Sequence, residues 1–159
     1  MSTIHRFKYS SETHLASSLG GLLASFVKEL LLDPKSFMTV PVPLHKHRLA
    51  ERGFNQSLLL ARTVSSILET PLDYRSLVRK KDTRSQTGLA RKDRKKNIAR
   101  AFSVISNSAF KGKNVLLVDD VLTTGYTLNE CAQTVKQSGA LKVICLALAR
   151  TVPSEEPYL

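Results

Sequence analysis

Cysteine and long apolar runs are both scarce in this sequence. The 159 residues include only two cysteines, Cys131 and Cys145, too few for a disulfide framework or a four-ligand zinc site. Each lies in an apolar-periodic segment, so we expect both to pack as small buried hydrophobes in a reducing compartment. The longest apolar stretch near the N-terminus, residues 22–32, is interrupted by a serine, a lysine and a glutamate. It is too short and too polar to cross a bilayer.

Further absences narrow the function. The first ten residues lack the charged, apolar and small-residue order of a secretory signal. We therefore expect a cytoplasmic protein without membrane insertion, and the length fits a single domain over residues 1–159. The chain contains neither Gly-x-x-x-x-Gly-Lys-Ser/Thr nor Gly-x-Gly-x-x-Gly. This disfavours a P-loop nucleotide site and a dinucleotide-binding fold.

Acidic residues are fewer than basic ones, and the basic residues are unevenly distributed along the chain. The chain has 13 Asp and Glu against 24 Lys and Arg, a formal charge of +11. Residues 79–100 hold ten basic and two acidic residues, which gives this stretch +8 of that total. Such a block attracts phosphates, pyrophosphate or nucleic acid, although a solvated surface loop can have the same composition. Few aromatic residues flank it, so a stacking platform for single-stranded nucleic acid is not evident.

Hydrophobic periodicity predicts alternating helices and strands, which favours an open, mostly parallel α/β sheet flanked by helices. Residues 45–53 are basic and non-periodic, so a loop is expected there. A helix is expected from Ser10 to just before Asp33, and others over residues 55–69, 92–101 and 127–138. The expected strands cover residues 37–42, 77–78, 102–105, 114–118 and 142–149, the last two of them buried.

The most informative segment is residues 115–127, VLLVDDVLTTGYT. Its strand delivers two adjacent carboxylates, Asp119 and Asp120, to the C-terminal edge of the sheet, where open α/β proteins bind ligands. The loop around Gly125 leads into a helix, whose N-terminal N–H groups donate hydrogen bonds to phosphate. Carboxylates accept hydrogen bonds from a vicinal diol, or assist Mg²⁺. The segment therefore predicts a ribose 5-phosphate site.

The same thirteen residues resemble the signature of type I phosphoribosyltransferases, which bind 5-phosphoribosyl-1-pyrophosphate (PRPP). Residues 41–56, PVPLHKHRLAERGFNQ, are similar to a block typical of the ComF competence-protein family. A second set of residues in this chain is similar to a later block of the same family: Arg84, Gln86, Thr87, Leu89, Arg94, Asn97 and Phe102. The resemblance covers roughly residues 7–150 and implies a type I phosphoribosyltransferase-like fold.

The resemblance also implies roles for particular residues. Asp119 and Asp120, the expected catalytic pair, would contact the ribose 2- and 3-hydroxyls, and Mg²⁺ would be held through the ligand rather than directly by the protein. The residues expected to hold the 5-phosphate are Thr123, Thr124, Gly125, Tyr126 (through its backbone) and Thr127. The candidates for pyrophosphate are Pro43, Leu44, His45, Arg48 and Arg52. A mobile hood over residues 80–96 would contribute Lys81, Arg84 and Gln86.

Two functions follow from the resemblance. One is Mg²⁺-dependent phosphoribosyl transfer with release of pyrophosphate, in a protein linked to DNA uptake. The alternative is a non-catalytic competence factor that binds single-stranded DNA and is regulated by PRPP. DNA-uptake proteins are expected partners, while the oligomeric state stays open, a homodimer included. ComF-type proteins commonly begin with a Cys-rich zinc module, and nothing like it precedes His5. We expect either a natural short form or a chain that lacks a segment, and no reader for an acceptor base is evident.

Two smaller motifs keep alternative interpretations. His45 and His47 form a His-x-His pair that can bind metal, but no Cys or further His lies nearby in the sequence. Phosphate contact or simple exposure is therefore favoured over a metal site. Asn55 could hydrogen-bond a substrate together with Gln56, or could instead be the N-cap of the following helix.

Overall fold

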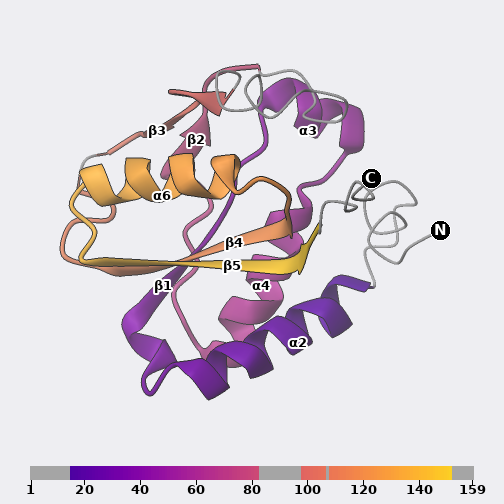
Figure 1. Ribbon diagram of the computed structural model, residues 1–159, viewed down its shortest axis with the longest axis vertical. Coiled ribbons are helices and arrows are strands. Elements are labelled where there is room, and N and C mark those ends of the chain that lie inside the picture. The colour runs from indigo at the N-terminus through magenta and orange to yellow at the C-terminus, as the bar shows by residue number, and fades with distance from the viewer. Residues whose placement is uncertain (1–14, 83–97, 107, 152–159) are drawn as a thin grey trace, which may run out of the picture.

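A computed structural model describes residues 15–82, 98–106 and 108–151 (Figure 1). Three parallel strands form the central sheet in the order β1 (Phe37–Pro41), β4 (Asn114–Leu122) and β5 (Lys142–Arg150). The parallel α/β architecture predicted from the sequence is confirmed. Several predictions lie outside the described residues: the helix start near Ser10, the hood positions Arg84 and Gln86, and most of the helix expected over residues 92–101.

One face of the sheet is covered by α2 (Leu15–Leu30) and α4 (Gln56–Leu68) (Figure 1). Both helices bury an apolar stripe, because apolar side chains recur at helical spacing on one side. The stripe packs on alternate residues of the strands, since successive strand residues point to opposite faces. The buried cluster between the helices and the sheet includes Leu23, Val27, Leu60 and Val64 from the helices and Leu116 and Val118 from β4.

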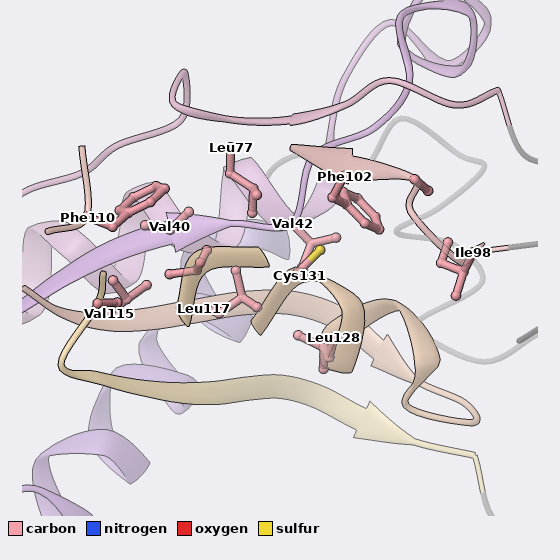
Figure 2. Close-up of a cluster of buried hydrophobic side chains, with 13 residues drawn as sticks. Val40, Val42, Leu77, Ile98, Phe102, Phe110, Val115, Leu117, Leu128 and Cys131 are labelled. Carbon is pink, nitrogen blue, oxygen red and sulfur yellow. The ribbon is translucent and has the colours of Figure 1, made fainter. Parts of the chain in front are cut away.

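The other face carries α6 (Tyr126–Gln137) and a small antiparallel sheet of β2 (Leu77–Arg79) and β3 (Phe102–Val104). Figure 2 shows the buried cluster between these elements and the central strands. Val115 and Leu117 of β4 alternate with the residues that face α2 and α4. Their partners across the cluster include Val40, Val42, Leu77, Phe102, Phe110, Leu128, Cys131 and Val135.

The structure corrects the loop expected over residues 45–53, because a short helix, α3 (Lys46–Arg52), lies there. The Nδ1 atom of His45 caps its start by accepting the N–H of His47, and Gly53 ends it in the left-handed conformation at φ = 75°. None of the helical residues is buried. The helix therefore has no apolar stripe, and hydrophobic periodicity could not reveal it. A single 3-10 turn over Pro34–Ser36 precedes β1.

The last two strands also differ from expectation. β4 continues to Leu122 instead of ending at Val118, because β5 pairs with it as far as Leu122 and Arg150. β5 is one of the two edge strands of the described sheet, the other being β1, and it buries only Leu146. The expectation that both cysteines are buried is thus wrong for Cys145, which is exposed on β5. It is correct for Cys131, where burial raises the pKa of the thiol well above its usual range.

No helix in the described part of the chain is long and apolar enough to cross a membrane. This agrees with the short, interrupted apolar stretch over residues 22–32.

Candidate functional site

The two acidic residues lie within the last part of β4. Asp119 is 9% exposed, and its Oδ1 atom accepts hydrogen bonds from Ser57 Oγ and from the N–H of Asp120, both at 2.9 Å. Asp120 is only partly buried, and its Oδ1 accepts the N–H of Val121 at 2.7 Å. One carboxylate is therefore held at the sheet edge by α4, while the next residue brings a second one closer to solvent.

The turn after β4 forms a small hollow at the start of α6. Gly125 is the N-cap of the helix and has φ = 77°, a left-handed conformation that glycine adopts without steric cost. The hollow is shallow and open to solvent on one side. Its lining comprises Asp119, Val121, Leu122, Thr123, Gly125, Thr127 and Leu128.

Thr124 gives this turn an unused polar group. Its Oγ1 atom is buried and has no hydrogen-bond partner among the described residues. Buried hydroxyls are normally satisfied, because leaving one without a partner costs about 1–3 kcal/mol. The first N–H groups of α6 are likewise oriented out of the helix end. The turn thus has donors that an anion could use, and its role toward a 5-phosphate stays a prediction.

The start of α4 connects the two halves of the site, a role that the sequence did not reveal for Ser57. Asn55 is the N-cap, because its Oδ1 accepts the N–H of Ser57 at 3.0 Å. Its Nδ2 donates to the carbonyl of Val42 at 3.0 Å, so the cap also holds the segment that follows β1. The N-cap interpretation of Asn55 is therefore confirmed. Gln56 is buried and accepts from Arg52 at 3.5 Å.

The predicted pyrophosphate segment begins beside the acidic end of β4. The N–H of Val42 donates to the carbonyl of Val118 at 2.8 Å, which places the following Pro43, Leu44 and His45 next to the strand that ends in the acids. Of the two arginines expected here, Arg48 donates to Glu51 at 3.4 Å within α3, and Arg52 donates to Gln56. Their roles toward pyrophosphate stay predictions.

Arg79 is a site residue that sequence reasoning missed, because it opens the basic run and was counted with it. Its side chain on β2 is partly buried, and its guanidinium carbon lies 5.5 Å from the centre of the Phe102 ring. Burial lowers the pKa of Arg79, while the negative charge of Asp119 opposes that change. Arg79 is therefore a partly buried cation whose charge interacts with that of Asp119. Lys81, by contrast, is exposed and donates to the carbonyl of Ala99.

A second polar cluster joins the start of α3 to Asp82, which lies three positions after β2. His45 Nδ1 lies 3.4 Å from Asp82 Oδ1, and His47 Nδ1 lies 2.7 Å from Asp82 Oδ2. The two imidazole rings meet edge to face with their centres 4.8 Å apart. The sequence indicated the His-x-His pair, but the third member comes from 35 residues further along the chain.

Comparison with known families agrees with this geometry. The phosphoribosyl transferase domain family matches residues 55–157, which include the start of α4, the acidic end of β4 and the turn around Gly125. The chain belongs to this family. Its relatives place it in the ComF branch: competence protein F of Haemophilus influenzae is 37% identical over 153 residues, 92% of this chain. DNA utilization protein YhgH of Escherichia coli K12 is 36% identical over 155 residues, 94% of this chain. The chain spans 66% of the length of each of these two relatives.

Solved structures confirm the fold. The allosteric regulatory enzyme of purine biosynthesis superposes with a TM-score of 0.60 over 91% of this chain and 30% of its own, at 16% identity. A purine phosphoribosyltransferase from Pyrococcus horikoshii superposes with a TM-score of 0.51 over 87% of this chain and 78% of its own, at 21% identity. At these identities the likeness establishes a type I phosphoribosyltransferase-like fold and nothing about substrates.

Proposed function

We propose that this ComF-type domain binds PRPP across the end of β4. The observation that carries the proposal is the junction of Asp119 and Asp120 with a glycine-capped helix N-terminus inside one short segment. Carboxylates accept hydrogen bonds from the two ribose hydroxyls, and the N–H groups at the start of α6 donate hydrogen bonds to the 5-phosphate. The hydroxyl of Thr124 supplies one further donor to that phosphate.

The pyrophosphate would extend toward the segment after β1. Val42 is hydrogen-bonded to Val118, so a sugar held at Asp119 lies next to Pro43 and the residues that follow it. Arg79 adds a positive charge that interacts with Asp119. A Mg²⁺ ion bound to the pyrophosphate would neutralise the negative charge of the leaving group. The carboxylate of Asp120 is partly exposed, and its oxygen atoms are of the kind that Mg²⁺ prefers as ligands.

Phosphoribosyl transfer is the reaction that such a complex supports. A nucleophile attacks C1 of the ribose, the bond from C1 to the pyrophosphate oxygen breaks, and the proton of the nucleophile passes to solvent. The protein has to position the sugar and stabilise the charge that develops on the leaving group. None of the described residues indicates which nucleophile receives the phosphoribosyl group.

A second candidate is binding of single-stranded DNA, favoured by the +8 charge of residues 79–100 and by the names of the relatives, competence protein and DNA utilization protein. Phosphate contacts release counterions, so this binding would weaken steeply with salt. Fluorescence anisotropy with a labelled single strand at low and physiological salt tests it. Affinity that hardly changes with salt would contradict it.

The proposed PRPP site is tested by calorimetry with the whole ligand and its two halves. We expect PRPP to bind more tightly with Mg²⁺ than without, and ribose 5-phosphate to bind more weakly than PRPP but independently of Mg²⁺. Release of pyrophosphate when candidate nucleophiles are added then separates turnover from binding. Absence of PRPP binding by folded protein, with and without Mg²⁺, would contradict the proposal.

A further inference from the structure

The cluster of His45, His47 and Asp82 lies outside the acid pair and the phosphate turn. It comprises two imidazole nitrogens and two carboxylate oxygens, and one ligand atom from each residue can be chosen so that all lie within 4.8 Å of one another. His45 is 7% exposed, whereas the His47 and Asp82 side chains are 63% and 47% exposed. One ligand is thus fixed in the protein and two are accessible from solvent.

One nitrogen of His45 has two possible partners. His45 Nδ1 accepts the N–H of His47 at 3.4 Å as the cap of α3, which requires an unprotonated nitrogen. The same atom lies 3.4 Å from a carboxylate oxygen of Asp82. A cation bound between His45 and Asp82 would use the single lone pair of Nδ1 and replace the long capping hydrogen bond.

The distances are near those around one shared ion. Metal–nitrogen and metal–oxygen bonds at a Zn²⁺ site are about 2.0–2.2 Å, so neighbouring ligand atoms around the ion are about 3–3.5 Å apart. The 3.4 Å between His45 Nδ1 and Asp82 Oδ1 lies in that interval. The 2.7 Å between His47 Nδ1 and Asp82 Oδ2 is a hydrogen-bond distance, which has to lengthen slightly when an ion binds. The exposed His47 side chain can rotate to bring its nitrogen nearer to that of His45.

We propose that His45, His47 and Asp82 bind a divalent transition-metal ion of the Zn²⁺ class. Imidazole nitrogens suit Zn²⁺, Co²⁺ and Ni²⁺, whereas Mg²⁺ prefers oxygen ligands and keeps its waters. Three protein ligands leave at least one coordination position for water or for an oxygen of a bound anion. The ion ties the start of α3 to the residue that lies three positions after β2. The site is formed by this chain alone and does not rest on PRPP binding.

The test uses chelator-treated protein titrated with Co²⁺, followed by its visible absorption, and with Zn²⁺, followed by calorimetry. We expect one equivalent to bind and the Co²⁺ spectrum to show imidazole ligation. His47→Ala and Asp82→Asn each remove one ligand at an accessible position, so we expect affinity to fall by about tenfold or more. Circular dichroism confirms that both variants remain folded.

Two controls separate this site from adventitious binding. Glu51→Gln removes a carboxylate of α3 that pairs with Arg48 and lies outside the cluster, so it should bind the metal like the unchanged protein. A His5→Ala/His14→Ala variant, which alters the other two histidines of the chain, should do the same. The proposal is overturned if folded protein binds neither ion, or if His47→Ala and Asp82→Asn retain full affinity.

Discussion

The hydroxyl of Ser57 donates a 2.9 Å hydrogen bond to Oδ1 of Asp119, and this contact ties the first turn of α4 to the acidic end of β4. Both residues are buried, although 62 positions separate them in the sequence. Because Asn55 caps the same turn and holds the carbonyl of Val42, α4 positions the acid pair and the segment after β1 together.

Ser57→Ala should therefore weaken PRPP binding without contacting the ligand. Hydrogen bonds to charged groups contribute about 1.5–3 kcal/mol, so we expect affinity for Mg²⁺-PRPP to fall about tenfold. Calorimetry measures the change. Ser66→Ala, on the exposed side of the same helix, is the matched control and should leave the affinity unchanged. Equal affinities in the two variants would show that Ser57 does not position Asp119.

Thr124→Val should separate ligand binding from stability. The substitution keeps the shape of the side chain but removes a buried hydroxyl that has no partner among the described residues. We expect the free energy of unfolding to stay equal or rise, while affinity for ribose 5-phosphate falls about tenfold through loss of one charge-assisted hydrogen bond. Thr134→Val, whose hydroxyl donates to the Glu130 carbonyl within α6, is the control. Unchanged ribose 5-phosphate affinity in Thr124→Val would exclude Thr124 from the phosphate site.

Gly20→Ala should destabilise the pair of helices on the first face. A Cβ atom at Gly20 would lie 2.5 Å from Thr63 Cβ, closer than any real contact, so α2 and α4 would have to separate. Overpacking of this kind costs about 1–3 kcal/mol and outweighs the gain of about 1 kcal/mol from replacing a helical glycine. Urea unfolding measures the net loss.

Gly21→Ala is the matched control, because a Cβ there meets only Ile67 Cδ1 at 4.0 Å. We expect it to raise the free energy of unfolding by up to about 1 kcal/mol. If both alanine variants changed stability in the same direction, the close helix approach at Gly20 would be wrong.

The two cysteines should differ in reactivity toward a thiol reagent. Cys145 is exposed on β5, whereas Cys131 is fully buried on α6. Burial raises the pKa of both thiols, and that of Cys131 well above its usual range. The thiolate is the reactive form, so we expect one thiol to react in native protein and the second only after unfolding. Cys145→Ser should abolish the native reaction. Rapid labelling of that variant would contradict the burial of Cys131.

The sequence predicted the elements whose side chains alternate between core and solvent. α2, α4, β1 and β3 lie where periodicity indicated them, and the structure places the predicted acid pair and the turn around Gly125 in consecutive positions at the end of β4. α3 was missed because it buries none of its residues. The exposure of β5 was missed because the extent to which other elements cover a strand is a property of the tertiary structure: β1 is also at an edge of the sheet, yet it is mostly buried.

The contacts that complete the site could not be predicted for a different reason. Ser57 meets Asp119, and Asp82 meets His47, only after segments that are 62 and 35 residues apart come together. Arg79 likewise looked like one member of a solvated basic run, but its place on β2 sets its guanidinium over the Phe102 ring and partly buries it. Local patterns identify the chemistry of such residues, but only the fold determines their partners.

The central claim is that PRPP binds at the acidic end of β4, and the most direct measurement is calorimetric titration of Mg²⁺-PRPP into the protein and into its Asp119→Asn/Asp120→Asn variant. The substitutions keep the size of the side chains while removing the charges, and circular dichroism confirms the fold. We predict saturable, Mg²⁺-assisted binding that the variant loses. Binding of equal affinity in the variant would place PRPP elsewhere and contradict the account.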